Sequence, residues 1–489
     1  MSLNRNDYRS QPDRVAALVR DTEVHKDLYI DQGLFELEME HLFSNTWVFV
    51  GHGSQIPKAG DYYTTTVGTQ PVVMVRHTDG SIKVLYNRCP HKGVKVAGEG
   101  CGNTGKFFRC PYHAWTFKLD GTLMSIPLKK GYEGTGVEDT EAAKGLACVG
   151  AMKVYRDFVF CRLNAEGVGF EEFFGQSLST IDNMVDRSPE GKLEVAGGML
   201  RYLHHCNWKM LQDNQTDTCH PMVAHESSAG TAVRVWNEAP PGTPKPMAVE
   251  LFAPFMSSYE FFEGMGIRVW ENGHGHTGVS NSIHADYSAV PGYQEQMVAA
   301  YGEERAHAIL GDVRHNTVYF PNLMVKGPIQ TLRLFKPIAA DRTLRKTHVG
   351  RALGTEDEGL QVYQDDTLRA DDKAFFLKVR DVVQAAVSEA TFRQTAQKLQ
   401  KTLKIPLVGD PVKTVEVLAQ RYTLNDAERS GVLRHLIAQA DLSGYGLVNA
   451  VTHFSQELDD YDRATEFEAL GGKLIELSAP EWKGLAEAA

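Results

Sequence analysis

The sequence predicts an α+β protein in which an antiparallel β domain precedes a mixed helix-and-sheet domain. Between residues 46 and 165, short runs of β-branched and aromatic residues are separated by turn signals such as Thr78-Asp79-Gly80. Helical runs then accompany several strand-like runs over residues 166–365. Helices covering a long antiparallel sheet are the simplest arrangement of such a mixture, so we expect two domains of different architecture.

Both ends of the chain are predicted to be helical. Residues 1–45 are polar apart from one amphipathic segment at 34–43, and we expect them to pack on the second domain. Residues 366–489 have strong helical propensity, interrupted by Pro406 and Pro411. Their pattern indicates a helical C-terminal segment but not its role.

The composition excludes several classes of protein. The chain has 489 residues, of which 42% are hydrophobic and 23% charged, as in ordinary globular proteins. Its formal net charge of −11 argues against a nucleic-acid partner. We find no run of about 18 apolar residues for a membrane and no secretory signal at the N-terminus. Seven scattered cysteines indicate a reducing compartment, and we expect the cytoplasm.

Two Cys/His pairs organise the first domain: Cys89-x-His91 and Cys110-x-x-His113. Each pair offers one sulfur and one imidazole. A [2Fe–2S] cluster of the Rieske kind requires this mixture, because two thiolates bind one iron and two histidines bind the other. The spacing therefore predicts two loops that each give one ligand to each iron.

A tetrahedral zinc site is the alternative, since two cysteines and two histidines also bind zinc. Zinc fingers, however, usually pair Cys with Cys and His with His. Here each loop carries one of each, which zinc does not require, and the iron–sulfur cluster is the favoured interpretation.

A second constellation follows at Asp217-x-x-His220-x-x-x-x-His225. Asn214, Asp217 and His220 are three residues apart and would share one face of a helix. His220 and His225 are about 140° apart on an ideal helix, so they can meet at one ion only if that helix is interrupted. We expect Pro221 to interrupt it, because proline disfavours helical geometry in the residue before it.

Two histidines and one remote carboxylate would form a facial triad, the open-sided site of non-haem Fe(II) oxygenases. A histidine pair on a helix is more often structural or solvent-facing when it stands alone. Here the neighbouring cluster motif favours metal binding, because iron that activates O2 needs electrons one at a time.

With both motifs in view, residues 20–365 resemble the large (α) subunit of a Rieske non-haem iron aromatic ring-hydroxylating oxygenase. One departure is Lys92, where family members often have arginine. The matching segments are Trp47 with the run VFVGH, Gly60-Asp61-Tyr62, Asn87-x-Cys89-Pro90-His91, Cys110-Pro111-Tyr112-His113-x-Trp115, Asn207-Trp208-Lys209 and the Asp217–His225 motif.

The resemblance implies a Rieske [2Fe–2S] domain at 46–165 and a helix-grip (START-like) catalytic domain at 166–365. It also implies a trimer of α subunits, with or without small β subunits, in which the cluster of one subunit serves the iron of its neighbour. Asp217 would then connect His91 or His113 of one chain to His220 of the next, without itself binding iron.

The family's third iron ligand is a late carboxylate. Asp357 is the first candidate here and Asp365 or Asp366 the next, although a solvated acidic turn is the alternative for this acidic run. Beyond residue 366 the oxygenase resemblance ends. Residues 366–489 instead resemble a phage- and plasmid-borne family of unknown function, so the chain is either a natural fusion or a chimera with an incomplete iron site.

These observations predict an oxygenase component that hydroxylates an aromatic compound with O2 at a mononuclear Fe(II). Electrons would come from NAD(P)H through a separate reductase and a ferredoxin, since no flavin or dinucleotide site is evident in the chain. Two alternatives stay open: a Rieske monooxygenase or demethylase, and a non-catalytic, decayed oxygenase that retains only the cluster.

Overall fold

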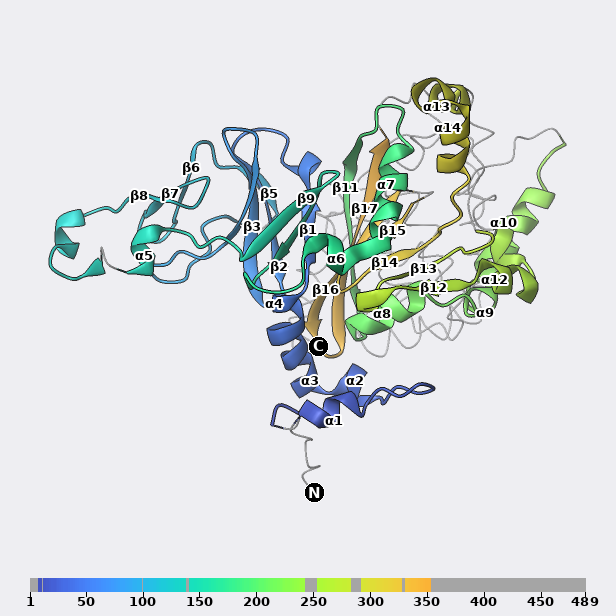
Figure 1. The fold of residues 1–489 in the computed structure, drawn as a ribbon, viewed down its shortest axis with the longest axis horizontal. Coiled ribbons are helices and arrows are strands. Elements are labelled where there is room, and N and C mark those ends of the chain that lie inside the picture. The colour runs from blue at the N-terminus through green and yellow to red at the C-terminus, as the bar shows by residue number, and fades with distance from the viewer. Residues whose placement is uncertain are drawn as a thin grey trace, which may run out of the picture.

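The computed structural model describes residues 8–352, except residues 11, 99, 138–139, 242–252, 283–291 and 328–329. Three small antiparallel sheets lie towards one end of the molecule and one large antiparallel sheet towards the other (Figure 1). The predicted C-terminal segment 366–489 and the acidic candidates Asp357, Asp365 and Asp366 lie outside the described residues.

The N-terminal helices form an arm on one side of the body (Figure 1). Asp31 begins the third of them, because its Oδ1 atom accepts a hydrogen bond from the Leu34 amide at 2.9 Å. A turn of π-helix at Glu38–Leu42 continues towards the first strand. The helices are α1 (Pro12–Ala16), α2 (Asp27–Ile30), α3 (Gln32–Leu37) and α4 (Phe43–Asn45).

The three small sheets contain the strands that the β-rich runs predicted. A turn between strands occurs at the expected Gly80 and another at Gly121; their φ angles are +85° and +92°, which glycine adopts without steric cost. The sheets are β1 (Val48–His52), β10 (Phe158–Arg162) and β9 (Ala151–Tyr155); β4 (Ile82–Tyr86), β3 (Gln70–Arg76), β2 (Asp61–Val67) and β5 (Cys101–Asn103); and β6 (Phe107–Arg109), β7 (Thr116–Lys118) and β8 (Leu123–Ser125). A short helix, α5 (Glu141–Lys144), follows β8.

The second half is built on a seven-stranded antiparallel sheet. In spatial order its strands are β11 (Leu193–His204), β17 (Arg342–Ala352), β16 (Thr331–Ala339), β15 (Leu323–Lys326), β14 (Thr317–Tyr319), β13 (Gly275–Thr277) and β12 (Ile267–Val269). The helices around it are α6 (Phe170–Phe174), α7 (Leu178–Asp186), α8 (Trp208–Gln215), α9 (Pro221–Ala224), α10 (Glu226–Asn237), α12 (Tyr259–Met265), α13 (Tyr293–Tyr301) and α14 (Glu303–Leu310).

Alternating side chains of one strand contact helices on opposite faces of this sheet. On β14, the Tyr319 hydroxyl donates to the Ser177 carbonyl at 2.6 Å, on the side of α7. The preceding residue of β14, Val318, faces the other side of the sheet and packs with Leu211 of α8. Helices α7 and α8 therefore cover different faces, and α8 defines the face on which the second motif lies.

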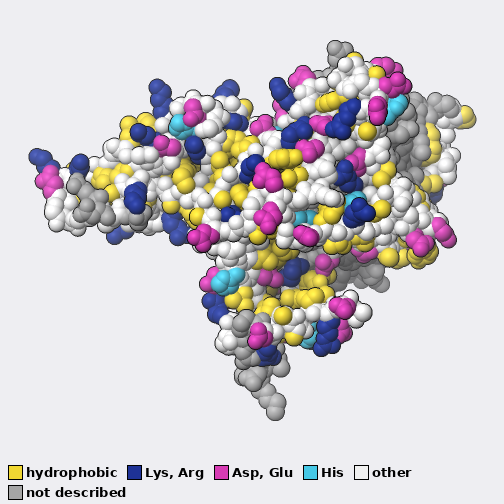
Figure 2. All heavy atoms as spheres, viewed as in Figure 1, with side chains coloured by type: hydrophobic (Ala, Val, Ile, Leu, Met, Phe, Trp, Pro, Cys, Tyr) yellow, Lys and Arg dark blue, Asp and Glu magenta, His cyan; other side chains and the backbone are white. Residues whose placement is uncertain are grey.

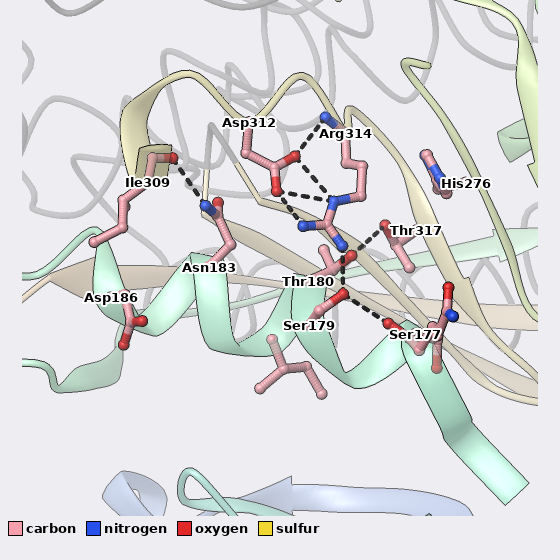
Figure 3. Close-up of polar contacts among 12 residues, drawn as sticks. Ser177, Ser179, Thr180, Asn183, Asp186, His276, Ile309, Asp312, Arg314 and Thr317 are labelled. Carbon is pink, nitrogen blue, oxygen red and sulfur yellow. Dashed lines mark hydrogen bonds and ion pairs between the residues drawn. The ribbon is translucent and has the colours of Figure 1, made fainter. Parts of the chain in front are cut away.

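Polar contacts fasten the loop after α14 to α7 (Figure 3). The Arg314 guanidinium pairs with Asp312 and donates to the Ser179 hydroxyl at 2.6 Å. The Asn183 amide donates to the Ile309 carbonyl at 2.8 Å. This network fixes the segment that leads into β14.

A buried asparagine contributes to the joint between the two halves. Asn322 accepts a hydrogen bond from the Phe49 amide at 2.9 Å and donates one to the Phe49 carbonyl at 2.8 Å. Only 6% of its surface is exposed, so both main-chain groups of Phe49 depend on it in a place with little water. The side chain acts as an additional strand partner for β1.

The surface shows charges of both signs interspersed on the face drawn in Figure 2. Among the described residues, none of the helices combines the length and the hydrophobicity that crossing a bilayer requires.

Replacing Asn322 by alanine should destabilise the protein by about 2–4 kcal/mol, because two buried main-chain groups lose their partner. The measurement is the midpoint of urea denaturation followed by circular dichroism. Asn164→Ala, at an exposed position, is the control and should change stability by less than about 0.5 kcal/mol. Equal shifts in the two variants would contradict the joining role of Asn322.

Candidate functional site

The first cluster loop follows β4 and is closed by Asn87. The Asn87 side chain accepts hydrogen bonds from the Val96 and Ala97 amides and donates to the Ala97 carbonyl, each at 2.9 Å. Within the loop, the Gly93 amide donates to the Cys89 carbonyl at 2.8 Å. Gly93 has a φ angle of +74°, which makes the turn possible directly behind the cysteine.

The second loop lies between β6 and β7. The Cys110 amide donates to the Trp115 carbonyl at 2.8 Å, and the Ala114 amide donates to the Cys110 carbonyl at 3.0 Å. Ala114 has a φ angle of +56°, a left-handed conformation that is unfavourable for alanine. Strained residues of this kind concentrate at functional sites, because the surrounding structure must hold them in place.

The structure brings the four predicted cluster donors together as a sulfur pair and an imidazole pair. Cys89 and Cys110 are 1% and 3% exposed. Burial, and to a smaller extent the Cys110 thiol, raises the pKa of Cys89. The rings of His91 and His113 are 4.6 Å apart between centroids. The sulfurs thus lie inside, and His113 lies at the exposed tip.

The surroundings of His91 fit a nitrogen that binds metal. Its ring stacks on Trp115 with 5.0 Å between centroids and 3° between planes. Its Nδ1 atom is buried and has no hydrogen-bonding partner among the described residues. An orphaned buried imidazole nitrogen is costly unless it coordinates an ion. The donor set therefore fits a [2Fe–2S] cluster.

The second motif adopts a different local structure from the one predicted. Helix α8 ends at Gln215, and Asp217 and His220 lie in the following loop rather than on one helical face. Pro221 does not break a helix; it is the first residue of α9, where its missing amide proton costs nothing. His220 has helical φ and ψ angles of −62° and −30°. The predicted interruption was therefore misplaced.

The two histidines nevertheless face each other. Their ring centroids are 5.6 Å apart, and the ring of Phe255 lies 5.0 Å from that of His225. Burial first, and then His220, Lys326 and Arg333, lowers the pKa of His225 to about 4. The imidazole is therefore neutral at physiological pH, the form that binds metal ions.

Asp217 holds the ring of His220 from the outside. Its Oδ1 atom accepts hydrogen bonds from the Cys219 amide at 2.7 Å and the His220 amide at 3.4 Å. Its Oδ2 atom lies 3.1 Å from His220 Nδ1. Burial opposes ionisation, but the Cys219 amide and His220 outweigh it, so the pKa of Asp217 lies below its usual value. The other ring nitrogen, Nε2, lies 3.1 Å from the Asn214 side-chain nitrogen, and a metal would bind it in place of that contact.

The described residues do not supply the third donor of a facial triad. Within the described ranges, no three His, Cys, Asp or Glu side chains are placed so that they could hold one ion. Asp357 is outside those ranges, and its role as a ligand stays a prediction, as do the ligand roles of His220 and His225.

The sequence did not indicate the neighbours of Asn214. Its amide nitrogen lies 3.1 Å from His220 Nε2, and its oxygen accepts a hydrogen bond from Gln215 at 2.8 Å. Gln215 in turn accepts one from Arg333 at 3.0 Å. Because Arg333 is 118 residues further along the chain, spacing could not reveal this contact.

Comparisons with known proteins agree with this organisation. Residues 46–142 match the family described as Rieske [2Fe-2S] domain. The α subunit of toluate 1,2-dioxygenase from Pseudomonas putida is 33% identical over 322 residues, which cover 65% of this chain and 68% of that protein. The large subunit of anthranilate 1,2-dioxygenase from Acinetobacter baylyi is 30% identical over 326 residues, with coverages of 65% and 67%.

A solved structure of a naphthalene 1,2-dioxygenase variant bound to phenanthrene has the same fold. Its TM-score is 0.57 at 24% sequence identity, covering 74% of this chain and 79% of that chain. The predicted fold class is thereby confirmed for the described part of the chain.

Cys89→Ser should remove the visible absorption of the cluster and lower the iron content by about two atoms per chain, because one of the two predicted thiolate ligands is lost. Iron analysis and the absorption spectrum of the purified protein measure this. The matched control is Cys101→Ser at an exposed position, which should keep both signals. Loss of the signal in the control alone would contradict the assignment.

Proposed function

The chain belongs to the α (large) subunits of Rieske non-haem iron ring-hydroxylating dioxygenases, and we propose that it hydroxylates an aromatic carboxylate with O2. The resemblance inferred from the motifs is confirmed by the 33% identity to a relative of which the match covers 68%. The observation that carries the proposal is the pairing of His220 and His225 behind Asp217, in a chain that also has a Rieske domain.

The donors divide the work between two sites. Cys89, Cys110, His91 and His113 would hold the [2Fe–2S] cluster, and His220 and His225, with Asp357 as the proposed third ligand, would hold the mononuclear iron. When bound, the cluster supplies single electrons and the mononuclear iron activates O2. The chain's own contribution is to keep His220 in one orientation through Asp217, and His225 neutral through burial.

Electron delivery would pass between chains rather than within one. In Figure 1 the strands β6 and β7, which flank the second cluster loop, lie on the other side of the molecule from α8 and α9. Both partners of a contact between chains are accessible: His113 is exposed, and the Asp217 side chain is 43% exposed. We therefore propose that Asp217 faces the cluster histidines of a neighbouring subunit in a trimer, either alone or with β subunits.

The preference for a carboxylate rests on charge and on the relatives. Lys326 and Arg333 both act on His225 through their positive charge. Cations beside a binding site favour an anionic substrate. Toluate and anthranilate, in the names of two relatives, are both benzoate derivatives. The reducing partner would be a ferredoxin or an NAD(P)H-dependent reductase, and the proposed location is the cytoplasm.

The substrate class is testable with a matched pair of ligands. With a chemical reductant, the iron-loaded chain should consume O2 faster with benzoate than with toluene, a neutral ring of similar size. Raising the ionic strength should weaken the preference, because salt screens charge. An oxygen electrode measures the rates, and product analysis shows whether hydroxylation accompanies uptake. Equal rates with both ligands, or a preference for toluene, would exclude a carboxylate site.

Asp217→Asn should lower turnover by about ten- to a hundredfold, the usual cost of removing a group behind a metal ligand. The cluster spectrum should stay unchanged, because Asp217 is no cluster donor. Steady-state rates and spectra of the full-length protein measure both effects. The control is Asp341→Asn, whose side chain is 81% exposed and which should behave like the parent.

A further inference from the structure

Three consecutive hydrogen bonds connect the large sheet to the proposed iron site. Arg333 Nη1 on β16 donates to Gln215 Oε1 at 3.0 Å. Gln215 Nε2 donates to Asn214 Oδ1 at 2.8 Å. Asn214 Nδ2 then lies 3.1 Å from His220 Nε2. We call this series the amide relay.

The direction of the amide relay is fixed at its sheet end. A guanidinium has donors and no acceptor, so Gln215 must turn its oxygen to Arg333. Its amide nitrogen then faces Asn214, which must present its own oxygen in return. As a result the N–H side of Asn214, and not its oxygen, points to His220.

The relay members are held in position by other contacts. Gln215 is the last residue of α8, is 6% exposed, and accepts a hydrogen bond at its main-chain carbonyl from the Asn316 side chain at 3.1 Å. Arg333 lies within β16, paired with Met324 on one side and Thr347 on the other. Gln215 and Arg333 are therefore held in place, and the side chain of the exposed Asn214 is the relay member that can still rotate.

The orientation of that amide matters for a metal on His220. Nδ1 of His220 faces Asp217, so an ion would bind Nε2 in place of the Asn214 amide, which is 3.1 Å from that nitrogen and would then lie beside the ion. An amide oxygen is a ligand for hard cations, whereas the neutral amide nitrogen is a hydrogen-bond donor. A reversed Asn214 would place its oxygen next to the ion and fill a position that the open-sided site requires.

We propose that Arg333, acting through Gln215, is a positioning residue that keeps the Asn214 oxygen away from the metal and so preserves an open coordination position. The inference rests on the proposed ligand roles of His220 and His225. It deepens the proposed function by assigning a role to the residues of the amide relay, none of which is a proposed metal ligand.

Gln215→Glu tests the direction of the relay with almost no change of shape. A carboxylate still accepts from Arg333, but it cannot donate to Asn214, which must turn its N–H side towards Glu and its oxygen towards the metal. The full-length protein is loaded anaerobically with Fe(II) and titrated with nitric oxide, a probe of the open position. Electron paramagnetic resonance of the iron–nitrosyl signal measures the affinity. We expect about a ten- to a hundredfold weaker affinity than in the parent, with iron content retained.

A second pair of variants separates direction from packing. Arg333→Lys keeps an end group that can only donate, so it should bind nitric oxide like the parent. Arg333→Met removes the donor and leaves Gln215 without orientation, so its affinity should fall towards that of Gln215→Glu. Restoration by lysine but not by methionine is a result that a purely structural role of Arg333 would not produce.

The control is Gln212→Glu on the same helix. Gln212 is 7% exposed and donates to the Pro321 carbonyl instead of to the relay. This variant should lose stability but keep the parental affinity for nitric oxide. Parental affinity in Gln215→Glu, or an equal loss in Gln212→Glu, would overturn the relay. Absence of mononuclear iron from the parent would instead overturn the proposed function.

Discussion

The attachment of α8 to its surroundings determines the geometry of the proposed iron site. Asn207 begins this helix: its oxygen accepts from the Lys209 amide at 3.1 Å, while its nitrogen donates to the Ala340 carbonyl at 2.9 Å in the turn between β16 and β17. Asn207 is 3% exposed, so neither bond can be replaced by water at little cost. One side chain thus starts the helix and fixes it to the sheet.

The N-terminal arm holds the same helix from the other side. Trp208 is fully buried, packs edge-on against Phe43 at 5.3 Å, and donates from its indole nitrogen to Glu38 at 2.9 Å. The Lys209 ammonium pairs with the same carboxylate at 2.5 Å. The three residues of the Asn207-Trp208-Lys209 motif thus have separate roles: Asn207 caps α8, Trp208 anchors it in the core and Lys209 pairs with Glu38. Together they fix the position of α8, which precedes the loop with the histidines.

What the sequence could predict follows from how local each feature is. Each cluster loop was predictable because its own Cys and His lie within a few residues of each other. In the first loop, Gly93 and the closing Asn87 are equally near. The break around His220 was misplaced because a proline can either end one helix or begin the next. The sequence does not show which of the two it does, since this depends on the surrounding packing. The hydrogen bond from Arg333 to Gln215 could not be predicted, since a contact between β16 and α8 depends on the register of the sheet.

That register gives one strand two separate tasks. On β16, Leu332 and Leu334 pack into the aromatic cluster beneath α6 and α7, whereas Arg333 between them reaches α8. A shift of β16 by one residue would exchange the two faces, burying the guanidinium among aromatic rings and removing the donor that orients Gln215. Pairing with β15 and β17 on both edges prevents the shift. The hydrophobic packing that stabilises the fold and the polarity of the proposed iron site are thus set by the same strand alignment.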